Sequence, residues 1–219
     1  EVARAYWKKL AVSIASLAPG DFTILTKLCA DANVNIIEVN VGCAHLMEFD
    51  GKQKPLPSYN PSALAANLDE VESFAQPEQE LRVKLSPYFD SVLIAEVADV
   101  LKSHPRFTPV FCNTLPNILM RRAEDRMPAI KSNGLGGHGG SDVFRWIVCG
   151  VIKQFQELLS GRRMIGVGGI SRGVHVLDYT DIGITDLQVA TAFYDTDDPH
   201  VFSDIRREYA DTFTNPQED

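Results

Sequence analysis

The sequence lacks the features that mark several large classes of protein. None of its apolar runs approaches the ~20 residues that a transmembrane helix needs. Its first residues show no basic segment followed by a long apolar one, so no signal peptide is expected. Its net charge of −8 lacks the positive excess that nucleic acid backbones attract. We therefore expect a cytoplasmic protein that binds neither membranes nor nucleic acids.

Cysteine is scarce and unpaired in spacing. The four cysteines are Cys29, Cys43, Cys112 and Cys149, and no two of them form a Cys-x-x-Cys pair. Neither a zinc site nor a disulfide framework is predicted, and the thiols are expected to be reduced. His45 and His138 lack metal-ligand spacing such as His-Glu-x-x-His, so no metal site is predicted.

The composition is that of an ordinary globular protein. The chain has 219 residues, 45% of them hydrophobic and 23% charged, and no change in composition marks a boundary. We therefore expect residues 1–219 to form a single domain.

Short apolar runs alternate with longer stretches of helical spacing. The runs are four to six residues long and rich in β-branched or aromatic residues, as buried parallel strands are; they cover residues 10–14, 36–40, 81–85, 107–112, 164–167 and 187–190. Six strand–helix repeats predict a parallel α/β sheet with right-handed crossovers. Periodicity alone fits an open sheet and a closed barrel equally well. Two segments, residues 44–61 and 115–133, have neither spacing and are expected to be loops that follow strands.

Glycines cluster after the predicted strands of the second half. One cluster is Gly134-Leu-Gly-Gly-His-Gly-Gly140, followed by Ser141 and Asp142, which are good residues to begin a helix. A second is Gly166-Val-Gly-Gly-Ile-Ser-Arg-Gly173. Glycines here let backbone N–H groups approach a phosphate, although each cluster alone could be a tight turn. The spacing fits the phosphate site of a (β/α)₈ barrel rather than a P-loop.

Polar residues stand at the ends of three predicted strands. Lys84 lies in an apolar strand, where an ammonium group needs an anion to contact or a chemical role. Asn40 and Asn113 end two other strands and could bind a planar polar ligand or cap a turn. Glu38, in the middle of a strand, needs a partner. Cys43 opens the first long loop, where a thiol can act as a general base.

Six motifs occur together in one order: Asn40-Val-Gly-Cys43, Val83-Lys-Leu-Ser-Pro-Tyr-Phe-Asp90, Asn113-Thr114, Gly134 to Gly140, Gly166 to Ile170 and Leu187-Gln-Val-Ala-Thr-Ala192. In this the chain resembles the class 1 dihydroorotate dehydrogenases, the cytosolic FMN enzymes of pyrimidine synthesis. The resemblance implies an FMN-binding TIM barrel, (β/α)₈, of which this chain carries six βα units. The first two units of the family barrel have no counterpart, so an N-terminally incomplete barrel is expected.

The resemblance also implies a role for each matching residue. Cys43 would be the catalytic base that takes a proton from dihydroorotate. Lys84 would contact the flavin ring, and the FMN phosphate would meet a set of residues at strand ends: Gly136, Gly137, Gly168, Gly169, Ala190 and Thr191. The substrate, dihydroorotate or its product orotate, would contact Asn40, His45, Asn113 and Thr114. The family also implies fumarate as electron acceptor and a homodimer.

The motif around the base departs from the family pattern, Asn-x-Ser-Cys-Pro-Asn. Here Gly42 replaces serine, Ala44 replaces proline, and His45 stands where a substrate-binding asparagine is expected. Two alternatives therefore stay open: a phosphate-binding barrel aldolase or isomerase that uses Lys84 as Schiff-base former or base, and a flavin-binding remnant without turnover.

Overall fold

Six parallel strands form one sheet in the computed structural model, which describes residues 9–43, 54–129, 135–196 and 199–214. Their order in the sheet follows the chain: β1 (Ala11–Ile14), β2 (Ile36–Asn40), β3 (Glu80–Lys84), β4 (Phe107–Phe111), β7 (Ile165–Val167) and β8 (Asp186–Gln188). All five pairings are parallel. The predicted strands are confirmed, each within about a residue or two of the expected bounds, as is the α/β class of an incomplete TIM barrel.

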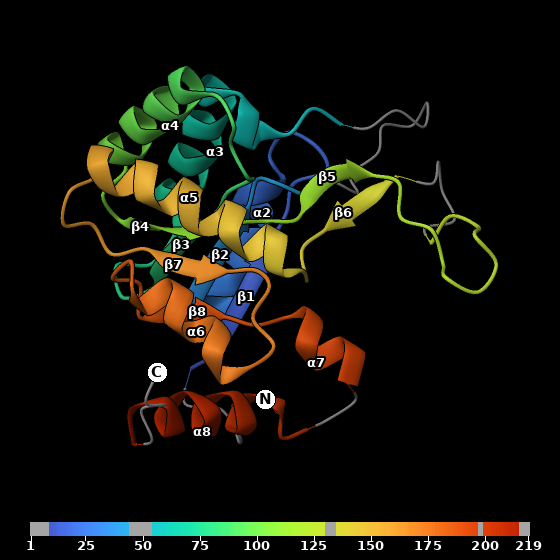
Figure 1. Cartoon of the computed structure of the whole chain (residues 1–219). Helices are drawn as coiled ribbons and strands as arrows, with labels where there is room; N and C mark the ends of the chain where they lie inside the picture. Colours follow the sequence, from blue (N-terminus) through green and yellow to red (C-terminus); the bar gives the residue numbers. More distant parts are fainter. Residues whose placement is uncertain (1–8, 44–53, 130–134, 197–198, 215–219) are drawn as a thin grey trace.

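Helices connect most of the strands and cover the outer face of the sheet (Figure 1). They are α2 (Asp21–Asp31), α3 (Pro61–Phe74), α4 (Ser91–Ser103), α5 (Asp142–Leu158), α6 (Gly173–Thr180), α7 (Thr191–Thr196) and α8 (Val201–Thr214). Side chains cap three of these helices: Asn60 accepts from the N–H of Ala63, Asp90 from that of Val92, and Ser141 from that of Phe144. The predicted start of a helix at Ser141 is thereby confirmed.

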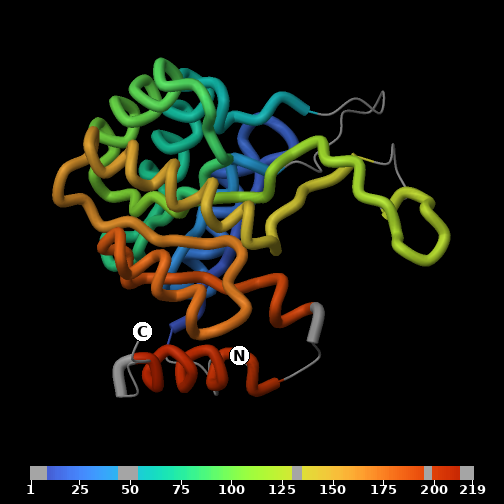
Figure 2. The backbone as a smooth tube through the Cα atoms, in the orientation of Figure 1, coloured from blue at the N-terminus to red at the C-terminus, as the bar shows by residue number. Residues whose placement is uncertain are grey.

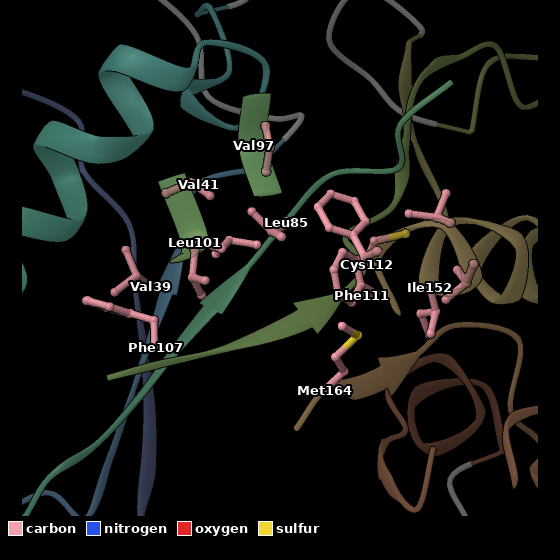
Figure 3. Close-up of a cluster of buried hydrophobic side chains, with 14 of the residues drawn as sticks. Val39, Val41, Leu85, Val97, Leu101, Phe107, Phe111, Cys112, Ile152 and Met164 are labelled. Carbon is pink, nitrogen blue, oxygen red and sulfur yellow. The ribbon is translucent and has the colours of Figure 1, made fainter. Parts of the chain in front are cut away.

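Side chains alternate along the strands between two environments. In β3, Leu81 and Val83 belong to the large hydrophobic core between sheet and helices, so Arg82 and Lys84 face the other side. Figure 3 shows this core, where Phe107 and Phe111 of β4 lie with Leu101 of α4 and Ile152 of α5. The opposite face holds a smaller apolar cluster of Val110, Ile165 and Val167. The strands are thus not uniformly apolar, and their charged residues line the inside of the curved sheet.

Contacts across the sheet show how strongly it curls. Gln188 of β8 donates from Nε2 to Glu38 of β2 and accepts from Nζ of Lys84 of β3, at 3.4 Å. Two strands, β4 and β7, separate β3 from β8 in the sheet. Side chains from strands near the two opposite edges of the sheet therefore meet on its concave face, as in a barrel interior.

The segment after β4 contains regular structure that the sequence did not predict. Residues 115–133 were expected to form a loop, but β5 (Leu115–Ile118) pairs in antiparallel fashion with β6 (Gly136–His138). The strands contain Pro116, Asn117 and three residues Gly-Gly-His, none of which favours a strand. The hairpin projects from the body of the protein in Figure 2, and an isolated bridge joins Arg121 to Pro128 beyond it.

The first long loop carries a short 3₁₀ helix, η1 (Pro57–Tyr59), whose Ser58 is fully buried. Ser58 Oγ accepts from the N–H of Ser86, which ties the end of this loop to the residues after β3. At the other end of the chain, α8 packs on α6, and Glu208 accepts from the N–H of Gly173. Among the residues that the structure describes, no helix is long and apolar enough to cross a membrane.

Candidate functional site

A cavity of about 270 Å³ lies at the carboxyl ends of the strands. Its walls come from the segments that follow β3, β4, β7 and β8, together with the residues before α5. Ligands of parallel α/β folds bind at this end, where loops from several strands converge. The lining residues are Lys84, Cys112, Asn113, Thr114, Gly139, Gly140, Phe144, Val167, Gly168, Gly169, Ile170, Ser171, Gln188, Val189, Ala190, Thr191 and Ala192.

Lys84 lies within this cavity with its ammonium group held by two side chains. Its Nζ lies 3.7 Å from Oε1 of Glu38, which is 7% exposed, and also contacts Gln188. Glu38 thus finds the partner that its position in a strand required. The ion pair neutralises the buried carboxylate and fixes the direction of the lysine side chain.

The two predicted strand-end amides contact each other directly. Asn113 donates from Nδ2 to Oδ1 of Asn40 over 2.7 Å, and the same oxygen accepts from the N–H of Gly42. Asn113 Oδ1 accepts from the N–H of Thr114. These bonds orient both amides, and Asn113 and Thr114 line the cavity. Three of the predicted substrate residues are therefore brought together, whereas His45 lies outside the described residues.

Cys43 lies three residues beyond Asn40 and is a half-buried free thiol. The preceding Gly42 is packed tightly, because a Cβ there would meet Ser86 Oγ at 2.5 Å and Asn113 Cβ at 3.3 Å. Cys43 thus follows a position at which a residue larger than glycine would displace Ser86 or Asn113. A second thiol, Cys112, lines the cavity, but burial raises its pKa strongly, which makes it a poor base.

The loop after β7 depends on two glycines. Gly168 and Gly169 have φ values of 135° and 64°, which side chains rarely allow. A Cβ on Gly168 would meet the ring of Phe144 at 2.7 Å, and one on Gly169 would meet the Ser141 carbonyl at 2.5 Å. The loop therefore lies directly against the start of α5. Its carbonyl at Gly168 accepts from the hydroxyl of Tyr179 over 2.8 Å.

The two glycines predicted from the earlier cluster lie elsewhere. Gly136 and Gly137 belong to β6 and are absent from the cavity lining given above, whereas Gly139 and Gly140 are part of it. A Cβ on Gly137 would meet Thr114 Oγ1 at 2.0 Å, so this glycine lets β6 approach the residue after Asn113. The N–H of Gly169 donates to the carbonyl of Gly139, which joins the two glycine loops.

Ala190 and Thr191 are exposed at the start of α7 and line the cavity. Both are residues that the family resemblance implies for the phosphate site. Thr191 packs on Gly140, where a Cβ would meet its Cγ2 at 2.7 Å. Sequence reasoning missed Ser171 and Gln188. Ser171 lies within the glycine motif and could have been included, but Gln188 gave no signal in a short apolar run. In the described part of the chain, no group of His, Cys, Asp and Glu side chains is arranged to hold a metal ion.

Comparison with known proteins agrees with this geometry. A family model described as dihydroorotate dehydrogenase matches residues 7–213. Over 199 residues the chain is 29% identical to a putative dihydroorotate dehydrogenase A (fumarate) of Streptococcus uberis, covering 90% of this chain and 61% of the relative. The dihydroorotate dehydrogenase A (fumarate) of Lactococcus lactis is also 29% identical, over 198 residues, covering 90% of this chain and 61% of that relative.

A solved structure supports the fold independently of close sequence similarity. The crystal structure of ligand-free type DHODH from Eimeria tenella matches with a TM-score of 0.69 at 15% sequence identity, covering 90% of this chain and 56% of that one. The chain spans about 61% of the length of the curated relatives it matches. With a family model that matches nearly all of its residues, the chain belongs to the dihydroorotate dehydrogenase family.

Proposed function

We propose that this chain is the part of an FMN-dependent dihydroorotate dehydrogenase that holds the catalytic base and most of the cofactor site, and that it oxidises dihydroorotate to orotate. One observation carries the proposal. Lys84 and Asn113 line the same cavity as Gly168 and Gly169, and Asn113 is hydrogen-bonded to Asn40. A cation, oriented amides and a glycine loop are what a flavin ring, a planar polar substrate and a phosphate each require.

The cavity has features that fit FMN. The loop from Gly168 to Ser171 has no side chain larger than hydrogen at its two strained positions, so a phosphate can approach the backbone. Lys84, at the end of β3, supplies positive charge where a reduced flavin ring gains negative charge. We assign the phosphate to Gly168, Gly169, Ala190 and Thr191. Gly136 and Gly137 act indirectly, by seating β6 against Thr114.

The residues of this chain divide the remaining work. When bound, FMN supplies the acceptor for the hydride that leaves C6 of the substrate. Cys43 takes the proton from C5, and the electron pair of the broken C5–H bond forms the double bond of orotate. Asn40, Asn113 and Thr114 hold the substrate ring and carboxylate through hydrogen bonds. His45 completes the substrate set in this proposal, in place of the family asparagine.

The wider assignments follow from family membership. We propose fumarate as the acceptor that reoxidises the flavin, because curated relatives carry fumarate in their names. A role in pyrimidine synthesis, a cytoplasmic location and a homodimeric state are part of the same proposal.

The direct test is a titration of the purified 219-residue chain with FMN, followed by anaerobic addition of dihydroorotate. We expect the visible flavin spectrum to shift on binding and the absorbance near 450 nm to bleach with substrate. A chain that takes up no FMN would contradict the proposal. A chain that binds FMN without bleaching would identify it as a flavin-binding remnant. Borohydride trapping of a carbonyl compound on Lys84 would instead support an aldolase.

A further inference from the structure

Arg145 is a buried charged residue next to the proposed phosphate loop. It lies in the first turn of α5 and is 5% exposed, yet it is absent from the cavity lining. Its Nη1 donates to the carbonyl oxygen of Gly169 over 2.9 Å. Arg145 therefore contacts the loop without lining the cavity.

Two carboxylates fix the arginine in this position. Nη1 also contacts Oδ1 of Asp142 at 2.7 Å, and Nε contacts Oδ2 of Asp178 at 2.5 Å. Burial alone would lower the pKa of Arg145, but the hydrogen bonds to Asp142 and Asp178 outweigh it and raise the pKa. The cation is thus permanently charged and already neutralised. Both ion pairs are with residues of α5 and α6, so Arg145 is suited to hold the loop rather than to bind a ligand.

Because the peptide bond is planar, the contact between Arg145 and the Gly169 carbonyl also fixes the direction of the next N–H, that of Ile170. In a trans peptide unit the C=O and the following N–H point to opposite sides. Since Arg145 holds the carbonyl of Gly169, the N–H of Ile170 is directed to the other side of the loop. Ile170 itself lines the cavity, as does Ser171.

Neighbouring contacts hold the rest of the loop in the same way. Tyr179 donates to the carbonyl of Gly168, and the N–H of Ser171 donates to Nδ1 of His175 over 3.2 Å. Among these three supports Arg145 is the one that is ionised at every accessible pH and that bridges two helices.

We propose that Arg145 is a positioning residue for anion binding: by holding the carbonyl of Gly169, it aims the N–H of Ile170 at the phosphate of the ligand. The inference rests on the proposed function, since that function supplies the phosphate. It predicts that Arg145 affects the affinity for a phosphorylated flavin far more than the affinity for the same flavin without phosphate.

The test compares FMN with riboflavin, which lacks the phosphate, by fluorescence titration of wild type, Arg145→Met and Arg162→Met. Arg162 is a matched control, because it is also an arginine that donates to backbone carbonyls, those of Leu101, His104 and Phe107, away from this cavity. We expect Arg145→Met to weaken FMN binding by about tenfold and riboflavin binding by less than about twofold, as the loss of one well-aimed charge-assisted contact would. Arg162→Met should leave the FMN-to-riboflavin ratio unchanged.

A milder variant keeps the test open if Arg145→Met does not fold. Asp178→Asn removes one of the two carboxylates that hold the guanidinium of Arg145. We expect it to lower the ratio of FMN affinity to riboflavin affinity by about threefold. In the FMN-bound protein, hydrogen exchange should quicken at the Ile170 N–H in both variants and stay unchanged in Arg162→Met. If the ratio of FMN affinity to riboflavin affinity is unaltered in both Arg145→Met and Asp178→Asn, the role of Arg145 is overturned while the proposed function still stands. Failure of the wild type to bind either flavin overturns the proposed function, and this inference with it.

Discussion

The two ends of the curled sheet use charged residues in opposite ways. At the amino ends of the strands, Arg163 contacts Glu80 at 2.9 Å and Asp186 at 2.6 Å, and Arg82 contacts Glu80 at 2.8 Å. Through Arg163, these ion pairs join β3 to β8 across the sheet. At the carboxyl ends, Lys84 and Asn113 line a cavity, and Asn113 is hydrogen-bonded to Asn40. The comparison separates residues that link the strands to one another from residues that we propose to contact a ligand.

The largest expected effect breaks function at the carboxyl end without breaking the fold. Cys43→Ala removes the proposed base, and we expect the anaerobic reduction of bound flavin by dihydroorotate to slow by roughly 10²-fold or more. Cys43 is a half-buried free thiol, so the free energy of unfolding should change by less than about 1 kcal/mol. Stopped-flow absorbance measures the rate, and urea titration measures the stability. A normal rate would remove Cys43 from the mechanism.

The next effect is the converse, a loss of stability without a loss of chemistry. Arg162→Met leaves the carbonyls of Leu101, His104 and Phe107 without their charged donor at the amino end of the sheet. We expect the free energy of unfolding to fall by about 2 kcal/mol, while the rate of flavin reduction stays within twofold of wild type. A rate loss as large as that of Cys43→Ala would show that the two ends do not act separately.

A smaller effect sharpens the comparison through pH. Burial tends to raise the pKa of Glu80, but its hydrogen bonds to Arg163 and Arg82 outweigh burial and lower it. A carboxyl group with a lowered pKa stabilises the fold above its unfolded pKa and loses that contribution as pH falls through its folded pKa. Glu80→Gln should therefore cost about 1 kcal/mol at pH 7, and much less in acid. Urea titrations at pH 7 and pH 3 measure the difference, and an equal loss at both would contradict it.

The smallest effect belongs to His175 beside the glycine loop. Burial first, and then the nearby charge of Arg145, lower its pKa below 6.5, while Asp142 acts in the opposite direction. The unfolded chain binds this proton more readily, so stability should fall as pH drops below about 6.5, with a slope of at most about 1.4 kcal/mol per pH unit. His175→Gln should flatten that part of the curve. Urea titrations from pH 7 to pH 5 measure it, and an unchanged slope would contradict the assignment.

The sequence predicted most of the sheet because strand formation here is decided locally. Ile36 to Asn40 and Phe107 to Phe111 are short apolar runs with helical spacing on each side, and both formed strands where expected. The hairpin of β5 and β6 could not be predicted in this way, because its paired residues, Leu115 with His138 and Ile118 with Gly136, are 23 and 18 positions apart and its sequence favours turns. Pairing supplied by tertiary contacts overrode the weak local preference.

For the site, residue types identified candidate residues but did not predict their contacts. Lys84, Asn40 and Asn113 were recognised from their places at strand ends. Lys84 of β3 and Asn40 of β2 lie opposite each other on neighbouring strands, so their proximity follows from the topology. Gln188 could not be recognised, because its contact with Glu38 depends on the curl of the whole sheet. Arg145 gave no signal for the same reason: it reads as one charged residue in an amphipathic helix until α5 is packed against the loop after β7.

The order of the strands also has a consequence for how the chain folds. Every strand pairs with the previous one in the large sheet, but the distances along the chain differ: Val110 and Ile165, which join β4 to β7, are 55 residues apart, whereas Ile165 and Asp186 are 21 apart. Closing the longer loop costs about 0.9 kcal/mol more conformational entropy. We expect the β4–β7 pairing to form late, after the two halves on either side have organised. The cavity at the carboxyl ends is lined by residues from both sides of that pairing, so we expect the ability to bind a ligand to arise only after β4 and β7 have paired.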